Sequence, residues 1–301
     1  MHWPALGSRV SVRYRLSPGD SSATTDVIGV LEAVAPALLI HTKSDGVVEV
    51  APDAVIAVKE IPYKPVRTSE IRALEHAAAL AWPGVEQHWL DGWLLRFGHG
   101  ATSRANSAVP LDFSSTLGAL PGIVEWYRER GLPAWLALPE RVLPVRAAGV
   151  KPARVMVRDI ADPAPAPPEA TLRSVPDAGW LTCYDRDVPV DVLTAVVDGE
   201  VTFASVAGAA VGRGAITGAP DGTRWLGISS VRVAPAARRR GHARRVCQAL
   251  VAWGAEHGAQ QAYVQVLADN GPAIALYTSM GFRLHHSHRY VQAEQLLGPT
   301  I

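Results

Sequence analysis

The sequence predicts a mixed α/β (α+β) protein that begins with a small all-β domain. Short alternating apolar runs separated by turns fill residues 1–62, a pattern typical of β-strands. Two proline-rich stretches, 61–65 and 162–169, fit neither a helix nor a central strand and predict linkers. After the second linker, strand patterns alternate with helical patterns that end at glycine. We therefore expect three parts, at residues 1–62, 63–161 and 170–301.

Length and composition fit a protein of several globular domains. The chain has 301 residues, 48% of them hydrophobic and 19% charged, so it can bury real cores. No apolar run reaches the ~20 residues that span a bilayer, and no export signal is visible at the first residues, so we expect a cytoplasmic protein without a membrane partner. Only Cys183 and Cys247 are present, too few for a disulfide framework, and we expect both to be buried apolar side chains.

The first part, residues 1–62, predicts a small curled barrel. Five short strand patterns occur in it, and residues 44–46 carry the Ser-Asp-Gly signal of a hairpin turn. Small barrels of the Src-homology or Tudor kind often bind peptides or nucleic acid. We favour a packing or dimerisation module, because Trp3, Tyr14 and the adjoining Tyr63 are the only aromatic residues in or next to it and form no evident aromatic cage.

The middle and last parts share a weak internal repeat. A helix over 117–130, a glycine and a strand over 134–138 are followed by residues 145–148, in the place of a second helix, by Gly149-Val150 and by a strand over 153–160. The last part repeats this order with helices over 243–257 and 272–280 and strands over 261–267 and 283–291. A chance coincidence of common helix–strand order is the alternative to a duplication.

The segment 231–245 predicts an anion site at a helix N-terminus. A strand pattern leads into a loop and then into an apolar helical pattern, and five arginines lie within eight residues. The first amides of a helix carry unsatisfied donors and partial positive charge, so an anion would neutralise both amides and arginines. A solvated helix face or a nucleic-acid contact is the alternative. The net charge of only +1 argues against nucleic acid.

A second motif follows at Asn270, residues 272–277 and the pair Gly281-Phe282. Together with Arg238, Gly241 and Ala243, which match the family loop Arg/Gln-x-x-Gly-x-Gly/Ala, it resembles the GNAT (GCN5-related) N-acetyltransferases. The resemblance implies a mixed central sheet flanked by helices. With the weak repeat, the chain resembles tandem members such as the mycothiol synthases, with a degenerate first copy that lacks the loop and the Asn and Tyr of the second motif.

The resemblance implies acetyl-CoA as co-substrate and Tyr277 as the acid that protonates the leaving thiolate. It places the pantetheine arm against the backbone of Val231 and Val233, and Asn270 beside that arm. The pyrophosphate would lie against the loop and the first amides of the helix. The implied pyrophosphate residues are Arg238, Arg239, Arg240, Gly241, His242, Ala243 and Arg244.

No general base is evident in the sequence. The strands over 225–233 and 262–266 contain no carboxylate, and Ser229, Ser230 and Asp269 are too weakly placed to be assigned. His285, His286 and His288 lack an accompanying cysteine or carboxylate, so we expect no metal site there. Polar and aromatic residues at 91–96 and 103–107 are candidates for the wall of an acceptor pocket, or simply a strand pair.

The sequence thus predicts an acetyl-CoA-dependent N-acetyltransferase that acts on a primary amine, in a small molecule or a protein lysine. One alternative is a sensor or scaffold that binds acyl-CoA without catalysis, which the missing base favours and the retained Tyr277 opposes. Another is a barrel that brings the enzyme to a protein or nucleic-acid target. The acceptor and the oligomeric state do not follow from the sequence.

Overall fold

A computed structural model describes residues 3–16, 23–43, 46–62, 64, 66–161, 163, 165–206 and 208–297. The chain divides into two compact units, Met1–Pro65 and Val66–Ile301. Residues 44 and 45 of the turn expected at 44–46 and parts of both proline-rich linkers lie outside the described residues.

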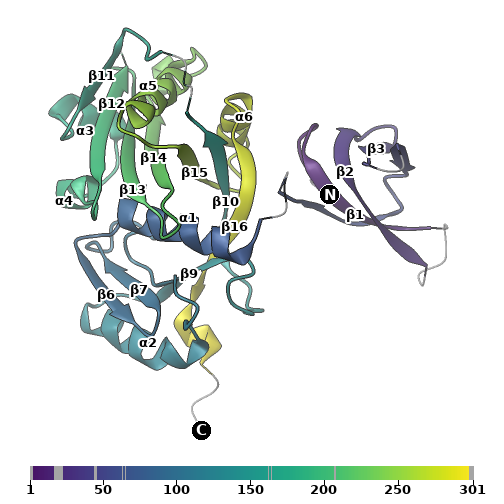
Figure 1. Cartoon of the computed structure of the whole chain (residues 1–301), viewed down its shortest axis with the longest axis horizontal. Helices are drawn as coiled ribbons and strands as arrows, with labels where there is room; N and C mark the ends of the chain where they lie inside the picture. The colour runs from purple at the N-terminus through teal and green to yellow at the C-terminus, as the bar shows by residue number, and fades with distance from the viewer. Residues whose placement is uncertain are drawn as a thin grey trace. The chain divides into compact units, whose positions relative to one another are not determined.

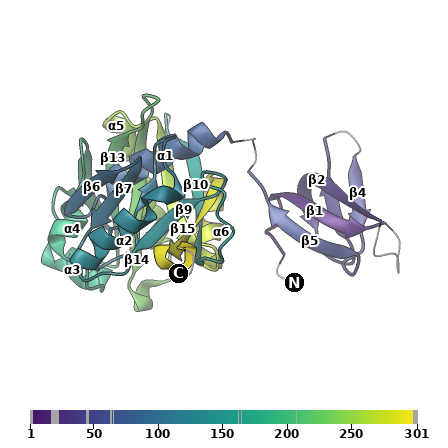
Figure 2. The same cartoon turned by 90° about the horizontal axis from the view of Figure 1, so that it is seen from below.

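The N-terminal unit is a five-stranded antiparallel sheet in the order β4-β3-β2-β1-β5. Its strands are β1 (Arg9–Arg15), β2 (Thr24–Ala33), β3 (Leu38–His41), β4 (Val47–Val50) and β5 (Val55–Glu60). Figure 2 shows β1 between β2 and β5. Alternate residues of the strands, among them Val10, Val12 and Leu31, point into one core, as the period of two predicts. The five predicted strands are all present.

The C-terminal unit is built on an eight-stranded sheet in the order β11-β12-β13-β14-β15-β10-β16-β9. Only the β14–β15 pair is parallel. The strands are β9 (Trp135–Pro139), β10 (Val150–Asp159), β11 (Ala170–Arg173), β12 (Glu200–Val206), β13 (Ala210–Gly218), β14 (Arg224–Val233), β15 (Gln261–Leu267) and β16 (Arg283–Gln292).

Helices cover both faces of this sheet (Figure 1). On one face lie α5 (His242–Glu256) and α6 (Gly271–Ser279), whose apolar residues share a core with Leu226 of β14. On the other face lies α1 (Thr68–Ala81), which packs on Trp225, the residue before Leu226. Successive residues of a strand face opposite sides, so β14 is buried on both. Two short helices, α3 (Ala178–Tyr184) and α4 (Val190–Thr194), lie between β11 and β12 in sequence.

A second core lies at the β9 edge of the large sheet. A three-stranded sheet of β6 (Glu86–Leu90), β7 (Trp93–Phe97) and β8 (Val109–Pro110) lies near α2 (Leu120–Glu129), which follows a 3-10 turn, Leu117–Ala119. Trp93 of β7, Tyr127 of α2 and Leu136 of β9 meet in this core, together with Ala293 from the 3-10 turn Ala293–Leu296. Figure 1 shows these elements together at one end of the unit.

The middle and last parts of the chain exchange strands. β10, from the middle part, lies between β15 and β16, and β16 from the last part lies between β10 and β9. The predicted middle and last parts therefore share one sheet. A boundary between residues 161 and 170 would separate β10 from β15 and β16, the two strands to which it is hydrogen-bonded. Of the predicted repeat, α2, β9 and β10 are present, but residues 140–149 form no helix.

Candidate functional site

The strand β14 parts from β15 halfway along its length. The two strands pair only from Trp225 to Ile228. Beyond this point β14 stays paired with β13, through a bulge in which Ser230 and Val231 stand opposite Gly212 alone. Ser230 has a φ of 54°, a value uncommon outside glycine. The backbone of β14 from Ser229 to Val233 therefore lacks a strand partner on its β15 side in the described structure, which leaves an edge for an extended ligand.

The loop after β14 ends in a helix N-terminus without a cap. A 3-10 turn, Pro235–Ala237, leads to Gly241, the N-cap residue of α5, whose φ is 80°. A Cβ placed on Gly241 would meet no atom within 4 Å, so glycine is needed for the backbone conformation and not for space. No side chain caps α5, and its first turn contains no acidic residue. The amides of His242, Ala243 and Arg244 are thus available to an anion.

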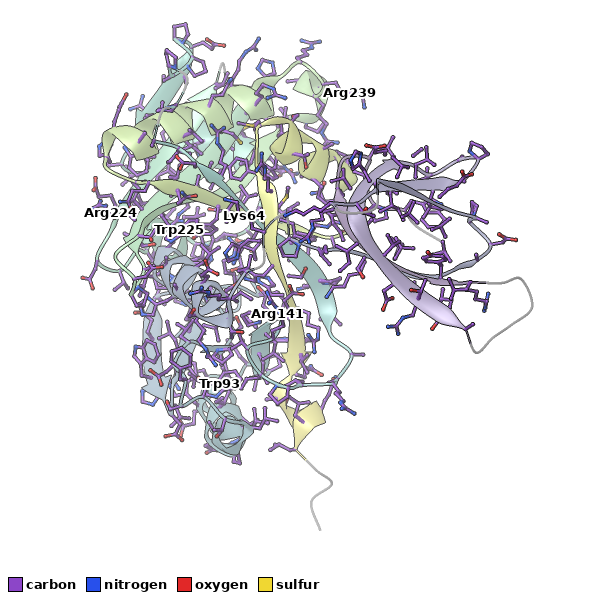
Figure 3. The ribbon with its side chains drawn as sticks, turned by 45° about the vertical axis from the view of Figure 1, so that its right-hand side comes forward. Lys64, Trp93, Arg141, Arg224, Trp225 and Arg239 are labelled. Carbon is purple, nitrogen blue, oxygen red and sulfur yellow. The ribbon has the colours of Figure 1, made fainter. Side chains whose placement is uncertain are left out.

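The five arginines of the loop divide into two groups. Arg244 donates to the hydroxyl of Ser279 at 2.7 Å, and Arg245 pairs with Glu169 at 3.1 Å. The other three side chains are exposed and, among the described residues, have no ion pair or hydrogen bond; they are Arg238, Arg239 and Arg240. Figure 3 shows Arg239 at the loop. Cations at a helix N-terminus repel the helix dipole, so this group favours an anionic ligand.

The second motif forms α6, next to the start of α5. The Arg244–Ser279 bond joins the two helices. Asn270 caps α6, accepting from the amide of Ala273 at 3.2 Å, and its side chain stays exposed. Tyr277 is 7% exposed and its ring contacts Phe282 edge-on at 5.7 Å between centroids. Burial, with Cys247 of α5 nearby, raises the pKa of Tyr277 above its usual range, so the phenol keeps its proton.

A pocket lies on the other face of the sheet, beneath the C-terminal end of α1. We call it the Trp82 pocket. Its lining residues are Ala81, Trp82, Arg104, Arg213, Gly227, Ile228, Ser229, Tyr263 and Gln265. It reaches the point where β14 leaves β15. The hydroxyl of Tyr263 lies 2.3 Å from where a Cβ of Gly227 would be, so only glycine lets this ring form the wall.

Sequence reasoning found this pocket only in part. Of the two candidate wall stretches, 103–107 supplies Arg104, whereas Arg96 of 91–96 is buried and donates to the backbone carbonyl and hydroxyl oxygens of Ser107 at 3.2 and 3.0 Å. Trp82 and Gln265 gave no signal, because each is unremarkable in its own segment.

Of the candidate bases, Ser229 lines the Trp82 pocket, whereas Ser230, Asp269 and the three histidines do not. Asp269 is exposed, in the turn before α6, and the hydroxyl of Ser230 lies 3.4 Å from that of Tyr184. His286 and His288 hydrogen-bond a carboxylate of α1, Glu75, at 2.8 and 3.4 Å. Glu75 lies on neither of the strands over 225–233 and 262–266, and its carboxylate already accepts the hydrogen bonds of the two histidines.

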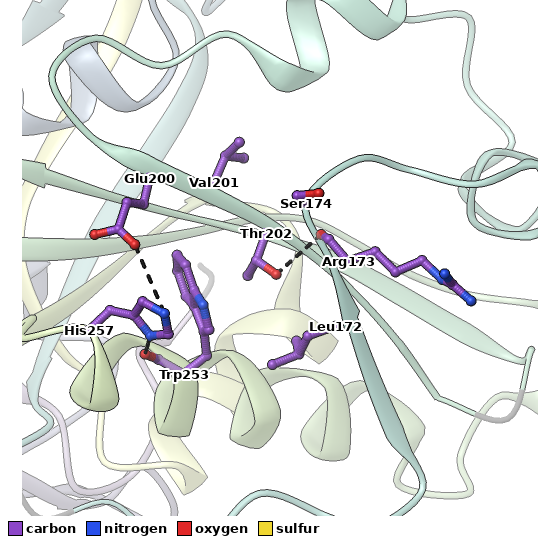
Figure 4. A pocket seen from close by; sticks show the side chains of 8 residues that line it. All are labelled: Leu172, Arg173, Ser174, Glu200, Val201, Thr202, Trp253 and His257. Atoms are coloured by element: carbon purple, nitrogen blue, oxygen red, sulfur yellow. Dashed lines mark hydrogen bonds and ion pairs between the residues drawn. The ribbon is translucent and has the colours of Figure 1, made fainter.

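A shallow hollow elsewhere in the unit does not belong to this site. It is lined by Leu172, Arg173, Ser174, Glu200, Val201, Thr202, Trp253 and His257 (Figure 4). Trp253 and His257 lie at the C-terminal end of α5, whereas the arginine loop precedes its N-terminal end. A 15-residue helix is about 22 Å long at ~1.5 Å per residue, so the hollow is remote from the loop.

Comparison with known proteins identifies the unit that carries this geometry. Residues 68–291 match the family model "Probable histone acetyltransferase Rv0428c C-terminal". Residues 4–59 match "Rv0428c N-terminal Sm-like domain". The chain belongs to this acetyltransferase family. The predicted N-terminal barrel is confirmed as a small domain, and its family model describes it as Sm-like.

Relatives and a solved structure agree with this acetyltransferase family. The chain is 48% identical over 297 residues to "Probable histone acetyltransferase Rv0428c" of Mycobacterium tuberculosis, covering 98% of this chain and 97% of that protein. It is 24% identical over 253 residues to "Uncharacterized N-acetyltransferase YobR" of Bacillus subtilis, covering 73% and 98%. A GCN5-related N-acetyltransferase from Kribbella flavida has a TM-score of 0.54 at 15% identity, covering 76% and 96%. The GNAT fold and the N-acetyltransferase class are confirmed.

The acetyltransferase has no helix, within the described part of the chain, that is long and apolar enough to cross a membrane.

Proposed function

We propose that this acetyltransferase uses acetyl-CoA and transfers its acetyl group to a primary amine. The uncapped N-terminus of α5 beside three exposed, unpaired arginines is the observation that carries the proposal. Amides and guanidinium groups arranged in this way suit a pyrophosphate, which takes hydrogen bonds from both. The residues that would bind it are the seven of 238–244, and Asn270 would contact the cofactor arm.

The unpaired edge of β14 supports a site for the pantetheine arm. Val231 and Val233 can offer backbone groups to its amides in the manner of an added strand. The bulge at Ser230 turns the backbone N–H groups there away from the direction of the regular strand. One of these N–H groups can therefore donate to the carbonyl oxygen of the thioester as negative charge develops on that oxygen.

Tyr277 supports the proton transfer at the end of the reaction. When bound, acetyl-CoA supplies a thioester whose C–S bond breaks as the amine nitrogen bonds to the acyl carbon. The buried phenol of Tyr277 retains its proton at neutral pH and can donate it to the departing sulfur. The phenol then recovers a proton from solvent.

Two measurements on the purified full chain test this function. Calorimetry should detect coenzyme A binding, and release of free thiol from acetyl-CoA should increase when a suitable primary amine is added. Binding without amine-dependent thiol release would instead favour the non-catalytic sensor or scaffold. Absence of coenzyme A binding would refute both functions.

A protein lysine is one candidate acceptor, because a relative with 48% identity is named a probable histone acetyltransferase. The amine panel should therefore include a lysine peptide beside small amines. Acetylation of the peptide alone would assign a protein acceptor.

A further inference from the structure

The Trp82 pocket has an excess of positive charge. The guanidinium carbons of Arg104 and Arg213 lie 5.6 and 4.5 Å from the ring centroid of Trp82, and the backbone oxygen of Trp82 accepts from Arg96 at 3.4 Å. None of these three arginines pairs with a carboxylate in the described residues. Glu75 acts on Arg96 electrostatically but is bound to His286 and His288.

Two of the three guanidinium groups are satisfied by the protein itself. Arg213 donates to the carbonyls of Leu193 and Ala195 at 2.6 and 2.8 Å, and Arg96 donates to Ser107 and Trp82. The side chain of Arg104 has no hydrogen bond in the described structure beyond its contact with the Trp82 ring. A half-buried cation without an anionic partner is unfavourable, so Arg104 is the group in this pocket that favours an anion.

The pocket also contains two polar atoms without partners. The hydroxyl oxygen of Ser229 and the Oε1 atom of Gln265 are buried and have no hydrogen bond to any described residue. Ser229 is the first residue of β14 beyond its pairing with β15, and Gln265 lies on β15. The two atoms therefore lie at the opening between the strands, beside the edge proposed for the pantetheine arm. Buried polar atoms without partners are uncommon and indicate a missing ligand group.

We propose that the Trp82 pocket binds the acceptor, and that the acceptor is a small primary amine that also carries a carboxylate. Arg104 would pair with the carboxylate, while Ser229 and Gln265 would accept hydrogen bonds from the amine at the strand opening. This inference rests on the proposed N-acetyltransferase function and specifies its substrate class. The enclosed space of the pocket is about 10 Å³, room for about one water-sized group, so the amine nitrogen would occupy it.

The charge of the pocket also bears on the missing base. Among the described residues no carboxylate lines the pocket, so an ammonium group would still meet Arg213 without a counter-ion once Arg104 is paired with the carboxylate of the acceptor. Nearby cations and burial both favour the neutral form of an amine. The amine would therefore enter as the free base and bond to the acyl carbon as the C–S bond breaks. Its surplus proton passes to water, and the sulfur is protonated by Tyr277.

The experiment compares amino acids with their carboxamides, which keep the shape but remove the negative charge. With acetyl-CoA and the full chain, we expect kcat/KM to be at least about tenfold higher for the carboxylate member of the best pair. In Arg104→Gln this preference should fall to about twofold or less. Arg104→Lys should retain part of the preference. Arg146→Gln, which changes an exposed arginine of the same unit, should leave it intact.

Three outcomes would overturn the pocket assignment. They are equal rates for carboxylates and carboxamides in the unaltered protein, a preference that survives Arg104→Gln, and a lysine peptide that is a better substrate than every small amine. Circular dichroism checks that Arg104→Gln is folded. If it is not, Ser229→Ala serves as the second variant and should raise KM for both members of a pair alike, and an unchanged KM would also refute the assignment.

The coenzyme A titration and the thiol-release assay separate this inference from the function on which it rests. Loss of coenzyme A binding refutes the proposed function. Coenzyme A binding and amine-dependent thiol release without a carboxylate preference refute only the pocket.

Discussion

Glu75 on α1 accepts a hydrogen bond from Nε2 of His286 on β16 at 2.8 Å, although the two residues are 211 positions apart. A second bond comes from Nδ1 of His288 at 3.4 Å, and all three side chains are almost completely buried. Burial alone would raise the pKa of Glu75, but hydrogen bonds from the two histidines outweigh it and hold the pKa well below its usual range. This cluster fixes α1, which covers one face of the sheet, to the exchanged strand β16.

Replacing Glu75 with alanine should destabilise the C-terminal unit strongly. Its loss leaves a ring nitrogen of His286 and one of His288 buried without a hydrogen-bond partner, which costs about 1–3 kcal/mol of the free energy of unfolding for each. Glu75→Gln keeps the size and one acceptor oxygen, so its loss should be smaller. Urea unfolding followed by circular dichroism measures both. Glu294→Ala removes an exposed carboxylate and should change stability little, and an equal loss in this control would contradict the assignment.

Acid should weaken the same cluster. Because the pKa of Glu75 is lower in the folded state, its contribution is present above the unfolded pKa of about 4.3 and is lost as pH falls below it. The free energy of unfolding should therefore fall between pH 5 and pH 3, by about 1 kcal/mol or more. Glu75→Gln should show a shallower decline over this range, measured by urea unfolding at each pH. Parallel curves for the two proteins would refute the coupling.

Gly241→Ala should weaken coenzyme A binding through the backbone. A Cβ at a φ of 80° costs about 1 kcal/mol, which corresponds to about fivefold in affinity if the loop relaxes away from its binding conformation. Calorimetry provides the measurement. Gly218→Ala is the matched control, because no atom lies within 4 Å of its Cβ position and its φ is not positive. Equal affinities for the two variants would show that the left-handed backbone at Gly241 does not matter for the ligand.

The loop arginines should differ in their effect on affinity. Arg239 is exposed and unpaired, so Arg239→Gln should lower coenzyme A affinity about fivefold and reduce its dependence on salt. Arg245 is paired with Glu169, so Arg245→Gln should change affinity by about twofold or less. Titrations at low and high salt compare the two variants. A larger effect at Arg245 would mean that the ligand lies elsewhere on the helix.

Tyr277→Phe should lower turnover at least about tenfold while leaving coenzyme A affinity nearly unchanged. The reason is that the hydroxyl acts on the leaving thiolate, whereas the ring, which packs against Phe282, is retained. Tyr14→Phe in the N-terminal unit is the control and should keep full turnover. If Tyr277→Phe were as active as the unaltered protein, Tyr277 would have no part in the proton transfer.

The sequence determined the features that depend on neighbouring residues. The helix that begins after Gly241, the arginine run before it and the helix that Asn270 caps are local, because caps, turns and helix starts are set within a few positions. The five strands of the N-terminal unit follow likewise from alternation within each strand. The site residues of the loop and of α6 could therefore be predicted before their spatial arrangement was known.

Only the tertiary structure decided which strands are neighbours. The pattern of β10 shows that it is a strand but not that it lies between β15 and β16, because strand pairing depends on contacts between residues far apart in the chain. The same holds for Glu75 with His286, and for Trp82, Arg104 and Gln265, which come from three separate elements or loops to form one pocket. Local chemistry thus fixed where the arginine loop and the helix after Asn270 lie, and long-range packing fixed which side chains line the pocket on the other face of the sheet.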